Sequence, residues 1–269
     1  MPERRLAAIT GASSGIGAAF ARQLAARGYD LLLIARREDR LRELAWELTA
    51  AHPISVDVMA EDLSQAEPLE AVARRIEEAG PLALLVNNAG FGLMGFFYEV
   101  PVDRLMEMHR LNVLATLRLS HAALVNFTLR GGASDRGIIN VSSVAAFATA
   151  PSSVGYNATK AWMKQFTEGL AVEMAAKNLP VRVQALCPGF TLTEFHDVVR
   201  MDRGAVPKSM WMTAEFVVEE SLKGFDKGKL IVIPGWRYRL LVFFIRRMPP
   251  AWMRRISIAS ARRFRKPKA

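Results

Sequence analysis

Short apolar runs alternate with segments of helical period along most of the chain. The apolar runs lie at residues 5–10, 30–35, 54–60, 82–87, 137–142, 181–187 and 229–234. Helical segments are predicted at 13–28, 37–51, 65–79 and 213–225, with further helices before residues 137 and 181. Strands uninterrupted by polar residues are buried on both faces, and this alternation is typical of a parallel sheet between two helical layers. The pattern predicts an α/β fold, a Rossmann-type doubly wound parallel sheet, in a single domain over residues 1–234.

The positive charge of the chain is concentrated at its end. The 269 residues carry a formal net charge of +10, and 51% of them are hydrophobic, enough for one large core. Residues 229–269 contain 12 Lys and Arg and no Asp or Glu, whereas residues 1–228 contain 24 basic and 26 acidic residues. The near-neutral body offers no basic groove to continue the tail, so we expect no nucleic-acid partner.

Residues 235–269 are predicted to form a basic amphipathic C-terminal extension. Two short helices are expected, because Pro249-Pro250 interrupts helical hydrogen bonding. In the second helix Trp252, Met253, Ile256 and Phe264 fall near one face, which is typical of a helix lying in an anionic membrane interface. Alternatively, the extension packs on the body or on a partner subunit, or its first helix forms the wall of a pocket.

Cysteine and histidine usage indicates neither a disulfide nor a metal centre. Cys187 is the only cysteine and ends an apolar strand, so we expect it to be a buried, small hydrophobic residue. A single cysteine also indicates a reduced, cytoplasmic compartment, with possible peripheral contact with the membrane. The histidines, at positions 52, 109, 121 and 196, show no metal-ligand spacing. The first residues run directly into a strand without a signal-peptide pattern, and no apolar run approaches the roughly 20 residues of a spanning helix.

A glycine-rich turn, "TGASSGIG" at residues 10–17, joins the first strand to the first helix. Gly11 permits a tight turn, Gly15 a close approach of backbone to phosphate, and Gly17 close packing of helix on sheet. Free amides and the dipole at the helix N-terminus favour an anion there. The turn therefore predicts the pyrophosphate site of a dinucleotide.

The tip of the second strand indicates which dinucleotide is bound. An acidic residue there would bond a free ribose 2′-hydroxyl, but the chain has Arg36 and Arg37. Guanidinium groups match phosphate geometry, so this pair favours NADP(H). Asp62, after the third strand, is placed to contact adenine, or else caps the next helix in competition with Ser64.

Tyr156 and Lys160 lie four residues apart in "GYNATK", on one face of a predicted helix. A free phenol has a pKa of about 10, and a cation one turn away favours the phenolate. Such a pair can protonate a carbonyl oxygen as hydride arrives, or run the reverse. Taken alone the spacing is more often a surface pair, but Ser143 ends a strand 13 residues earlier.

With these motifs in order, the chain resembles the short-chain dehydrogenase/reductase family over roughly residues 5–234. The resemblance rests on "TGASSGIG", Asp62-Leu63, "NNAG" (87–90), Asn112 in "LNVLATL", Ser143, "YNATK" and "PGFTLT" (188–193). It implies that Tyr156 is the general acid/base and that Lys160 holds the nicotinamide ribose and lowers the pKa of Tyr156. Ser143, rather than its neighbour Ser142, would hold the substrate oxygen. Asn112 would kink its helix and hold a water that links Lys160 to solvent.

The resemblance also implies the rest of the site. The "NNAG" segment would line the cofactor cleft, the "PGFTLT" segment would receive the nicotinamide carboxamide, and residues 201–212 would be a substrate lid. The expected cofactor contacts are Gly11, Ser13, Ser14, Gly15, Ile16, Gly17, Arg36, Arg37, Asp62, Leu63, Asn88, Ala89, Gly90, Tyr156, Lys160, Pro188, Gly189, Thr191 and Thr193.

The expected substrate pocket is largely apolar, with no Arg or Lys among its residues. Its members are Phe91, Leu93, Met94, Ala145, Phe147, Phe190 and Phe195. The leading hypothesis is an NADP(H)-dependent oxidoreductase that interconverts a lipophilic ketone and its secondary alcohol. One alternative is a 3-oxoacyl-thioester reductase of fatty-acid type, whose acidic carrier the basic tail could serve. Another is a non-catalytic protein that senses NADP(H).

Association into a homodimer or homotetramer is expected from the resemblance. In the family, the helices that carry Asn112 and Tyr156 commonly pack against those of a second subunit. The apolar positions that would suit such contacts are Leu117, Leu124, Phe166 and Leu170.

Overall fold

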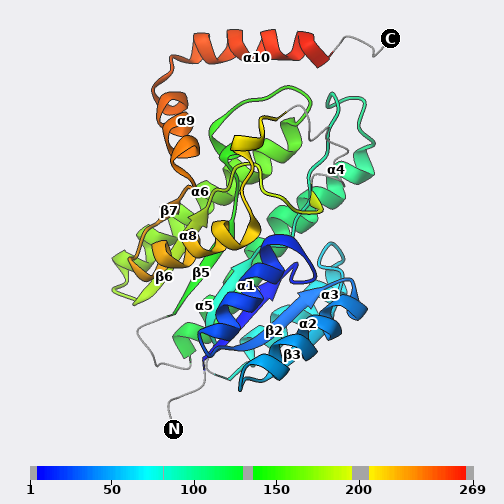
Figure 1. The fold of residues 1–269 in the computed structure, drawn as a ribbon, viewed down its shortest axis with the longest axis vertical. Coiled ribbons are helices and arrows are strands. Elements are labelled where there is room, and N and C mark those ends of the chain that lie inside the picture. Colours follow the sequence, from blue (N-terminus) through cyan, green and yellow to red (C-terminus); the bar gives the residue numbers. More distant parts are fainter. Residues whose placement is uncertain (1–4, 81, 130–135, 196–205, 265–269) are drawn as a thin grey trace.

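The computed structural model describes residues 5–80, 82–129, 136–195 and 206–264, and only the backbone at 250 and 260–264 (Figure 1). Seven parallel strands form one sheet in the order β3-β2-β1-β4-β5-β6-β7. They are β1 (Leu6–Thr10), β2 (Asp30–Ala35), β3 (Val56–Ala60), β4 (Leu82–Asn87), β5 (Arg136–Val141), β6 (Val181–Leu186) and β7 (Ile231–Val232). The strand order reverses between β1 and β4, so the predicted doubly wound sheet is confirmed.

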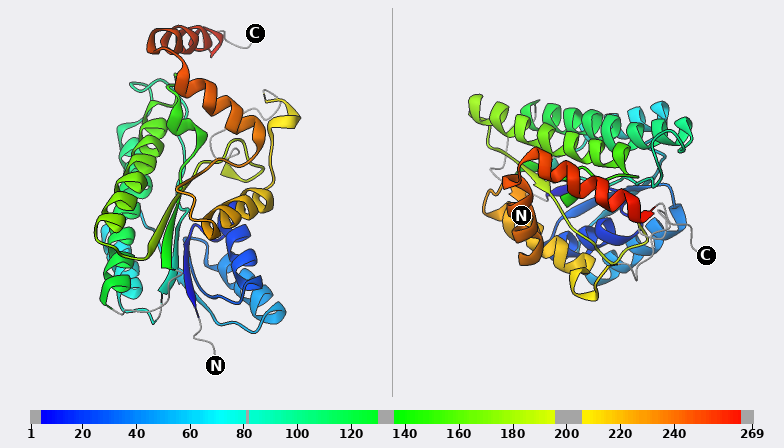
Figure 2. Two further views of the ribbon diagram at one scale, coloured as in Figure 1. Left: turned by 90° about the vertical axis from the view of Figure 1, so that its left-hand side faces the viewer. Right: turned by 90° about the horizontal axis from the view of Figure 1, so that it is seen from above.

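Helices cover both faces of the sheet (Figure 2). Helices α1, α2 and α8 pack on one face and α3, α5 and α6 on the other. The helices are α1 (Gly15–Ala26), α2 (Glu38–Ala51), α3 (Ala66–Glu77), α4 (Val102–His109), α5 (Thr116–Leu129), α6 (Val154–Ala176), α8 (Ala214–Asp226), α9 (Trp236–Arg247) and α10 (Pro250–Phe264). Three short turns of other types also occur: η1 (Arg110–Ala115, π), η2 (Val144–Phe147, 3₁₀) and η4 (Lys208–Met210, 3₁₀).

The core has two halves because successive strand residues point to opposite faces. In β1, Ala7 and Ile9 join the half formed with α1, whereas Ala8 joins the half formed with α3. Phe20 from α1 and Ile76 from α3 are fully buried in their respective halves. This two-sided burial explains why the strands read as continuous apolar runs.

The edge strand β7 is shorter than predicted. It pairs with β6 through Ile231 and Val232 only, whereas an apolar run over 229–234 was expected to form the strand. Lys229 instead bonds back to the carbonyl of Gly224 at the end of α8. The apolar pattern does not distinguish this turn from the strand that follows it.

The C-terminal extension forms two helices, as predicted, with the break at Pro249. α9 packs against η2, and Ser257 of α10 donates a hydrogen bond to the carbonyl of Thr149, 2.6 Å away. Seen from above, α10 lies across the carboxyl edge of the sheet, between the two helical layers (Figure 2). The extension is therefore packed against the segment that follows β5.

The positions expected to form a subunit contact are mostly turned inward, so that part of the prediction was wrong. Leu170 is buried, and Leu124 and Phe166 pack against the core half that contains α5 and α6. Leu117 is exposed, as is Leu114 nearby. Helical periodicity defined an apolar face on α5 and α6, but that face covers the sheet.

No helix within the described residues is long and apolar enough to cross a bilayer. The same residues contain no cluster of His, Cys, Asp and Glu side chains that could hold a metal ion. Position 196, one of the four histidines, lies outside them. Cys187 is fully buried, as predicted, and burial raises the pKa of its thiol to about 12.

Candidate active site

The glycine turn after β1 has the backbone that the sequence predicted. Gly11 and Gly15 have φ values of +65° and +54°, in the left-handed region that favours glycine. A Cβ on Gly17 would lie 2.2 Å from the carbonyl oxygen of Gly11. Substitution at Gly17 would therefore push against backbone, which keeps the start of α1 tightly packed on the turn.

Hydrogen bonds from the residues that directly follow β4 hold this turn in place. The hydroxyl of Thr10 accepts from the backbone N–H groups of Asn88 and Ala89, each at 2.9 Å. The side-chain amide of Asn88 donates to the carbonyls of Thr10 and Gly11, at 2.9 and 3.2 Å. Asn88 thus braces the turn, and Thr10, a threonine at the carboxyl end of a strand, is a supporting residue that sequence reasoning missed.

Arg37 lies over the glycine turn. Its guanidinium donates to the hydroxyl of Ser14 at 2.8 Å and to that of Ser13 at 3.1 Å. Its other terminal nitrogen donates to Glu194, 2.8 Å away, and Arg40 shares the same carboxylate. Hydrogen bonds from Arg40 and then Arg37 lower the pKa of Glu194 to about 2. Glu194 follows the "PGFTLT" segment directly and was not anticipated.

These residues fit an anionic dinucleotide with an additional phosphate. The turn presents backbone N–H groups at the start of α1 that have no intrahelical partner. Ser13, Ser14 and Arg37 form a polar, cationic cluster beside them, and Arg36 is exposed next to that cluster. Both arginines predicted for the 2′-phosphate therefore lie at the tip of β2, and Arg37 contacts the turn.

The Asp62-Leu63 pair lies just after β3. Asp62 accepts two hydrogen bonds from Ser64, from its backbone N–H at 3.0 Å and its hydroxyl at 2.7 Å. α3 begins after Gln65, so Asp62 does not cap it. The Leu63 side chain is buried in the core half that contains α3, so only its backbone remains available to a ligand.

Asn112 lies in the π turn η1 between α4 and α5, which is the predicted helix irregularity. It is fully buried. Its Oδ1 accepts from the N–H of Phe91 at 3.1 Å, and its Nδ2 donates to the carbonyl of Phe91 and to the hydroxyl of Thr159, at 3.0 and 3.1 Å. Gly90 is required here, because a Cβ on it would lie 2.8 Å from Asn112 Oδ1. Asn112 therefore ties the segment after β4 to α6.

The two adjacent serines after β5 differ in burial and in hydrogen-bond partners. Ser142 is buried and donates to the carbonyl of Lys160 at 2.8 Å. Ser143 is only partly buried, and its hydroxyl accepts from the N–H of Ala145 at 3.1 Å, capping η2. Ser143 therefore has the accessible hydroxyl, in agreement with the prediction that it, rather than Ser142, holds the substrate oxygen.

Tyr156 and Lys160 lie near the start of α6. The Lys160 ammonium donates to the carbonyl of Val141 at 2.8 Å and lies 5.8 Å from the centre of the Tyr156 ring. Burial lowers the pKa of Lys160 to about 8. Burial also raises the pKa of Tyr156 to about 12, opposed by a hydrogen bond with the Ser143 hydroxyl.

The sequence predicted that Lys160 lowers the pKa of Tyr156, but the contacts of Lys160 within the protein do not produce this effect. The ammonium is directed at the carbonyl of Val141, and desolvation weakens its own charged form. The Ser143 hydroxyl is the group of the chain that favours the phenolate of Tyr156.

One aromatic side chain just after the "PGFTLT" segment lies against Tyr156. The ring of Phe195 lies 5.7 Å from that of Tyr156, and the ring of Phe190 lies 5.5 Å from that of Trp211. Leu93 and Ala145 are partly buried, whereas Met94 is exposed. Of the predicted pocket residues, Phe195 is thus the one seen against Tyr156.

Two cations from other positions lie beside the predicted pocket residues, none of which is itself an Arg or Lys. Arg104 lies over the ring of Phe91 at 5.2 Å, and Lys164 over the ring of Phe147 at 5.7 Å. Arg104 is paired with Glu107 and Lys164 with Glu168. Since each cation has its own carboxylate, neither provides an uncompensated charge for a small acid.

Tyr238 of α9 holds both ends of the segment that begins after Gly189. Its hydroxyl accepts from the N–H of Phe190 at 2.9 Å and donates to the carbonyl of Met210 at 2.7 Å. Its ring fills the space above Gly189, where a Cβ would lie 2.0 Å away. The backbone N–H of Met212 donates to the carbonyl of Phe190 and so joins the two ends of the same segment. Within the predicted lid at 201–212, positions 201–205 lie outside the described residues.

The remaining residues of this loop also lie along the edge of the site. Pro188 accepts from the N–H of Val144 at 3.0 Å, which holds the loop beside η2. Thr191 is buried and donates to the carbonyl of Gly189. A Cβ on Gly15 would lie 2.9 Å from a methyl carbon of Thr193. The loop therefore spans from η2 to the glycine turn, as the cofactor-contact prediction requires.

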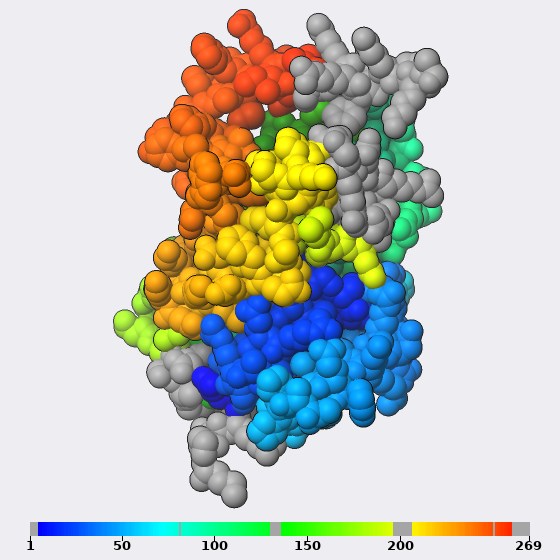
Figure 3. All heavy atoms as spheres, in the orientation of Figure 1, coloured from blue at the N-terminus to red at the C-terminus, as the bar shows by residue number. Residues whose placement is uncertain are grey.

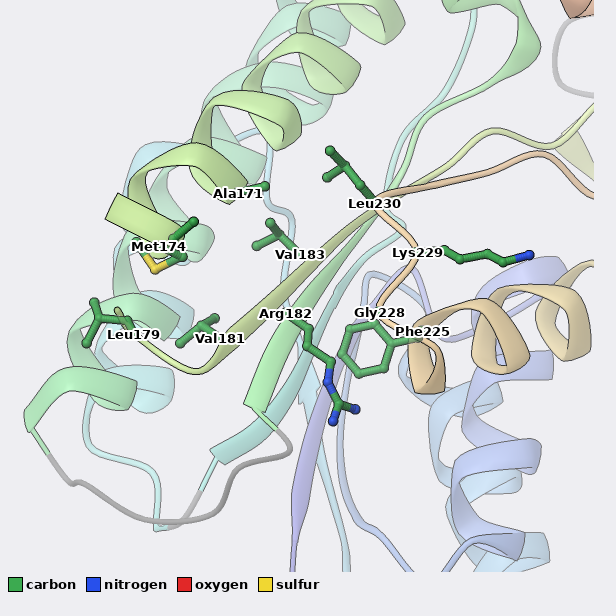
Figure 4. A pocket seen from close by; sticks show the side chains of 11 residues that line it. Ala171, Met174, Leu179, Val181, Arg182, Val183, Phe225, Gly228, Lys229 and Leu230 are labelled. Carbon is green, nitrogen blue, oxygen red and sulfur yellow. The ribbon is translucent and has the colours of Figure 1, made fainter. Parts of the chain in front are cut away.

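A depression of about 270 Å³ lies away from these residues, between the C-terminal part of α6, the amino end of β6 and the α8–β7 turn (Figure 4). Arg182 and Phe225 form one side of it, with the guanidinium 6.0 Å from the ring centre. The candidate catalytic residues lie at the opposite, carboxyl ends of the strands, where ligands bind in such sheets. The depression is therefore separate from the candidate active site.

Comparison with known proteins agrees with this geometry. The family model for short chain dehydrogenases matches residues 5–204. A short-chain dehydrogenase from Sphingobium yanoikuyae, solved in complex with NADPH, has a TM-score of 0.80 at 30% identity, covering 98% of this chain and 97% of that one. A bulky-bulky ketone specific alcohol dehydrogenase from Comamonas testosteroni has a TM-score of 0.76 at 30% identity, covering 98% and 95%.

Two of the similar curated proteins are longer than this chain. A very-long-chain 3-oxoacyl-CoA reductase from Anas platyrhynchos is 30% identical over 196 residues, which cover 71% of this chain and 61% of that protein. A human relative, named inactive hydroxysteroid dehydrogenase-like protein 1, is 28% identical over 191 residues, 70% of this chain and 56% of that protein. The match thus spans less than two thirds of the length of these relatives.

Proposed function

Because the chain belongs to the short-chain dehydrogenase family of oxidoreductases, we propose that it uses NADP(H) to interconvert a lipophilic ketone and its secondary alcohol. The observation that carries the proposal is the cluster at the carboxyl edge of the sheet. Tyr156 lies there beside the Ser143 hydroxyl and the ring of Phe195, with Lys160 buried behind it. A proton donor, a second hydroxyl and an apolar wall thus meet at one place.

The residues of the chain supply the proton chemistry. When bound, the dinucleotide supplies or accepts the hydride. Tyr156 donates its proton to the carbonyl oxygen during reduction and takes it back during oxidation, and the Ser143 hydroxyl donates a second hydrogen bond to the same oxygen. Lys160 places positive charge next to Tyr156. Asn112 is a positioning residue, because it acts through Phe91 and Thr159.

The preference for NADP(H) rests on the tip of β2. Arg37 already binds the hydroxyls of Ser13 and Ser14, and Arg36 is exposed beside it. Solved neighbours include complexes with NADPH and with NAD, so the fold alone does not select the cofactor. The charge at these two positions supports the phosphorylated form.

The proposed substrate is a bulky, lipophilic ketone or alcohol. Support comes from the aromatic side chains near Tyr156 and from the neutralised cations beside Phe91 and Phe147. The Comamonas protein, similar over almost its whole length, is described as specific for bulky-bulky ketones. A 3-oxoacyl thioester is the second candidate, because the duck relative is named a very-long-chain 3-oxoacyl-CoA reductase.

A spectrophotometric screen distinguishes these candidates from a non-catalytic, cofactor-sensing role. NADPH consumption would be followed at 340 nm, near the cofactor's absorption maximum, with three substrate sets: diaryl ketones, steroid ketones and 3-oxoacyl thioesters. We expect turnover of the ketones to exceed that of the thioesters and to vanish in Tyr156→Phe. Faster turnover of the thioesters would favour the second candidate. NADPH binding without turnover of any set would favour the sensing role.

We further propose that the protein is a homodimer or homotetramer, as is common in this family. The exposed apolar side chains Leu114, in η1, and Leu117, at the start of α5, support a contact there. Light scattering at micromolar concentration tests this proposal, and Leu114→Ser combined with Leu117→Ser should lower the mass. A monomer of the unaltered chain would contradict it.

A further inference from the structure

Helix α9 carries apolar side chains on two opposite faces. Its inner face holds Tyr238 and Val242, which are 3% and 2% exposed. This face packs against η2 and against Gly189. An amphipathic helix on a protein surface would normally turn mainly polar residues outward, but α9 turns large apolar side chains outward together with its arginines.

The outer face of α9 is apolar and uncovered. Trp236, Leu240, Phe243 and Phe244 are 61%, 48%, 46% and 57% exposed. At 100° per residue these four positions fall on the side opposite Tyr238. They form a stripe over three turns, which we name the α9 stripe.

Helix α10 extends the apolar surface. Trp252, Ile256 and Ile258 are 64%, 53% and 47% exposed. In the space-filling view, α9 and α10 together form one end of the molecule (Figure 3). Of the four residues predicted for the apolar face of the second helix, Trp252 and Ile256 are exposed, Met253 is only partly exposed, and the side chain of Phe264 lies outside the described part.

Arginines border this apolar surface. Arg247 lies over the ring of Phe243 at 3.6 Å and Arg237 over the ring of Trp236 at 4.9 Å, so each cation is held against an exposed aromatic side chain. Further arginines are at positions 239, 246, 254 and 255, and residues 229–269 contain no acidic residue. Of these, Arg239 lies 3.7 Å from Glu220.

We infer that the α9 stripe and the exposed face of α10 form a surface that docks on anionic phospholipid membranes. Exposed Trp and Phe side chains beside arginines are the composition of helices that lie in the headgroup region, where each basic side chain gains attraction to anionic lipid. A second copy of the chain fits the surface less well, because a two-fold contact would bring the same arginines together.

The docking surface is connected to the candidate active site. Tyr238, on the inner face of α9, binds the backbone of Phe190 and Met210, and Ser257 of α10 binds the carbonyl of Thr149. Both helices therefore lie on the substrate side of the sheet, where a lipophilic molecule could enter from the bilayer. Docking itself does not depend on the proposed reaction.

Co-sedimentation of the full chain with vesicles tests the inference. Vesicles of phosphatidylcholine with 30% phosphatidylglycerol should bind the protein at least tenfold more strongly than pure phosphatidylcholine vesicles. Raising the salt from 0.1 to 0.5 M should weaken that binding severalfold. No sedimentation with anionic vesicles at low salt would overturn the inference.

Matched variants identify the surface. Phe243→Ser with Phe244→Ser, and separately Arg246→Glu with Arg247→Glu, should each weaken vesicle binding at least tenfold. The controls are Trp46→Ser, an exposed tryptophan on α2, and Lys227→Glu with Lys229→Glu, an equal charge change at the end of α8. Both controls should bind as the unaltered chain does. Unchanged thermal melting and NADPH binding would show that each variant is folded.

Two results would overturn the assignment of this surface. One is equal vesicle binding by the stripe variants and the controls. The other is a loss of oligomer mass in Phe243→Ser with Phe244→Ser while the unaltered chain ignores anionic vesicles, which would make the surface a subunit interface.

Discussion

Glu194 and Arg37 form an ion pair beside the glycine turn, with 2.8 Å between a carboxylate oxygen and a guanidinium nitrogen. Arg40 shares the carboxylate, and the pKa of Glu194 falls to about 2, so the group stays charged at any working pH. Both partners are more than a third exposed, so the pair adds little to folding stability. The ion pair is instead expected to affect ligand binding, because it joins the loop after β6 to the proposed 2′-phosphate site.

Neutralising this carboxylate should strengthen NADPH binding. In Glu194→Gln the negative charge beside Arg37 is lost, so a 2′-phosphate no longer competes with it. We expect the Kd for NADPH to fall by roughly five- to tenfold, about 1 kcal/mol, and the Kd for NADH to change less than twofold. Titration by calorimetry measures both. Glu47→Gln, which removes an equally exposed partner of Arg22, is the control and should change neither. Weaker NADPH binding in Glu194→Gln would instead assign Glu194 a role in holding Arg37.

Removing the arginines should have the opposite effect. Replacing Arg36 or Arg37 by Ala takes away a charge-assisted hydrogen bond, worth about 1.5–3 kcal/mol, so NADPH should bind roughly ten- to a hundredfold more weakly. Arg36→Asp should bind NADH as well as the unaltered chain or better, since the new carboxylate can accept from a free 2′-hydroxyl. The same titrations apply. An unchanged preference in the double variant would remove the basis for assigning NADP(H).

Tyr156→Phe should abolish turnover while leaving NADPH binding nearly intact. The variant loses one oxygen, the proposed proton donor, and keeps the ring that packs against Phe195. We expect kcat to fall by at least a thousandfold with any substrate found in the screen, and the Kd for NADPH to stay within threefold. Substantial turnover would refute the proton-transfer role.

Local features of the site were predictable from the sequence, and long-range pairings were not. The left-handed glycines of the turn, the π-helical Asn112 and the accessible Ser143 follow from motifs within a few residues. Glu194 and Tyr238 act on partners far away in sequence, so only the folded chain brings them to Arg37 and Phe190.

Burial explains most of the errors. The pattern identified Leu170 as apolar but gave it a subunit contact, whereas it lies in the core. The Tyr156–Lys160 spacing predicted a charge effect on the phenol, but the same burial that forms the site opposes ionisation of both groups. Desolvation depends on what surrounds a residue on all sides, and one helix face does not reveal it.

Removing the hydroxyl of Tyr238 should loosen the loop that holds Phe190. Tyr238→Phe keeps the ring over Gly189 but leaves the N–H of Phe190 and the carbonyl of Met210 without this partner. A polar group that loses its hydrogen-bond partner costs about 1–3 kcal/mol. We therefore expect KM for the ketone to rise roughly tenfold and kcat to change less than threefold. Tyr98→Phe, at an exposed tyrosine, should be silent. An equal fall in kcat would indicate a role in the chemical step instead.

The buried ammonium of Lys160 should make folding stability depend on pH. Its pKa falls from an ordinary 10.5 to about 8 because the group is buried. Below pH 8 the folded state therefore contains a buried charged ammonium, which lowers the free energy of unfolding. Between about pH 8 and 10.5 the unfolded chain binds more protons than the folded one at this residue, and stability therefore rises with pH. Lys160→Met should remove this rise, which is on the order of 2–3 kcal/mol, while the exposed Lys177→Met should keep it. Urea unfolding at pH 7 to 10 measures the difference, and parallel pH profiles for the unaltered chain and Lys160→Met would show that the ammonium is not desolvated.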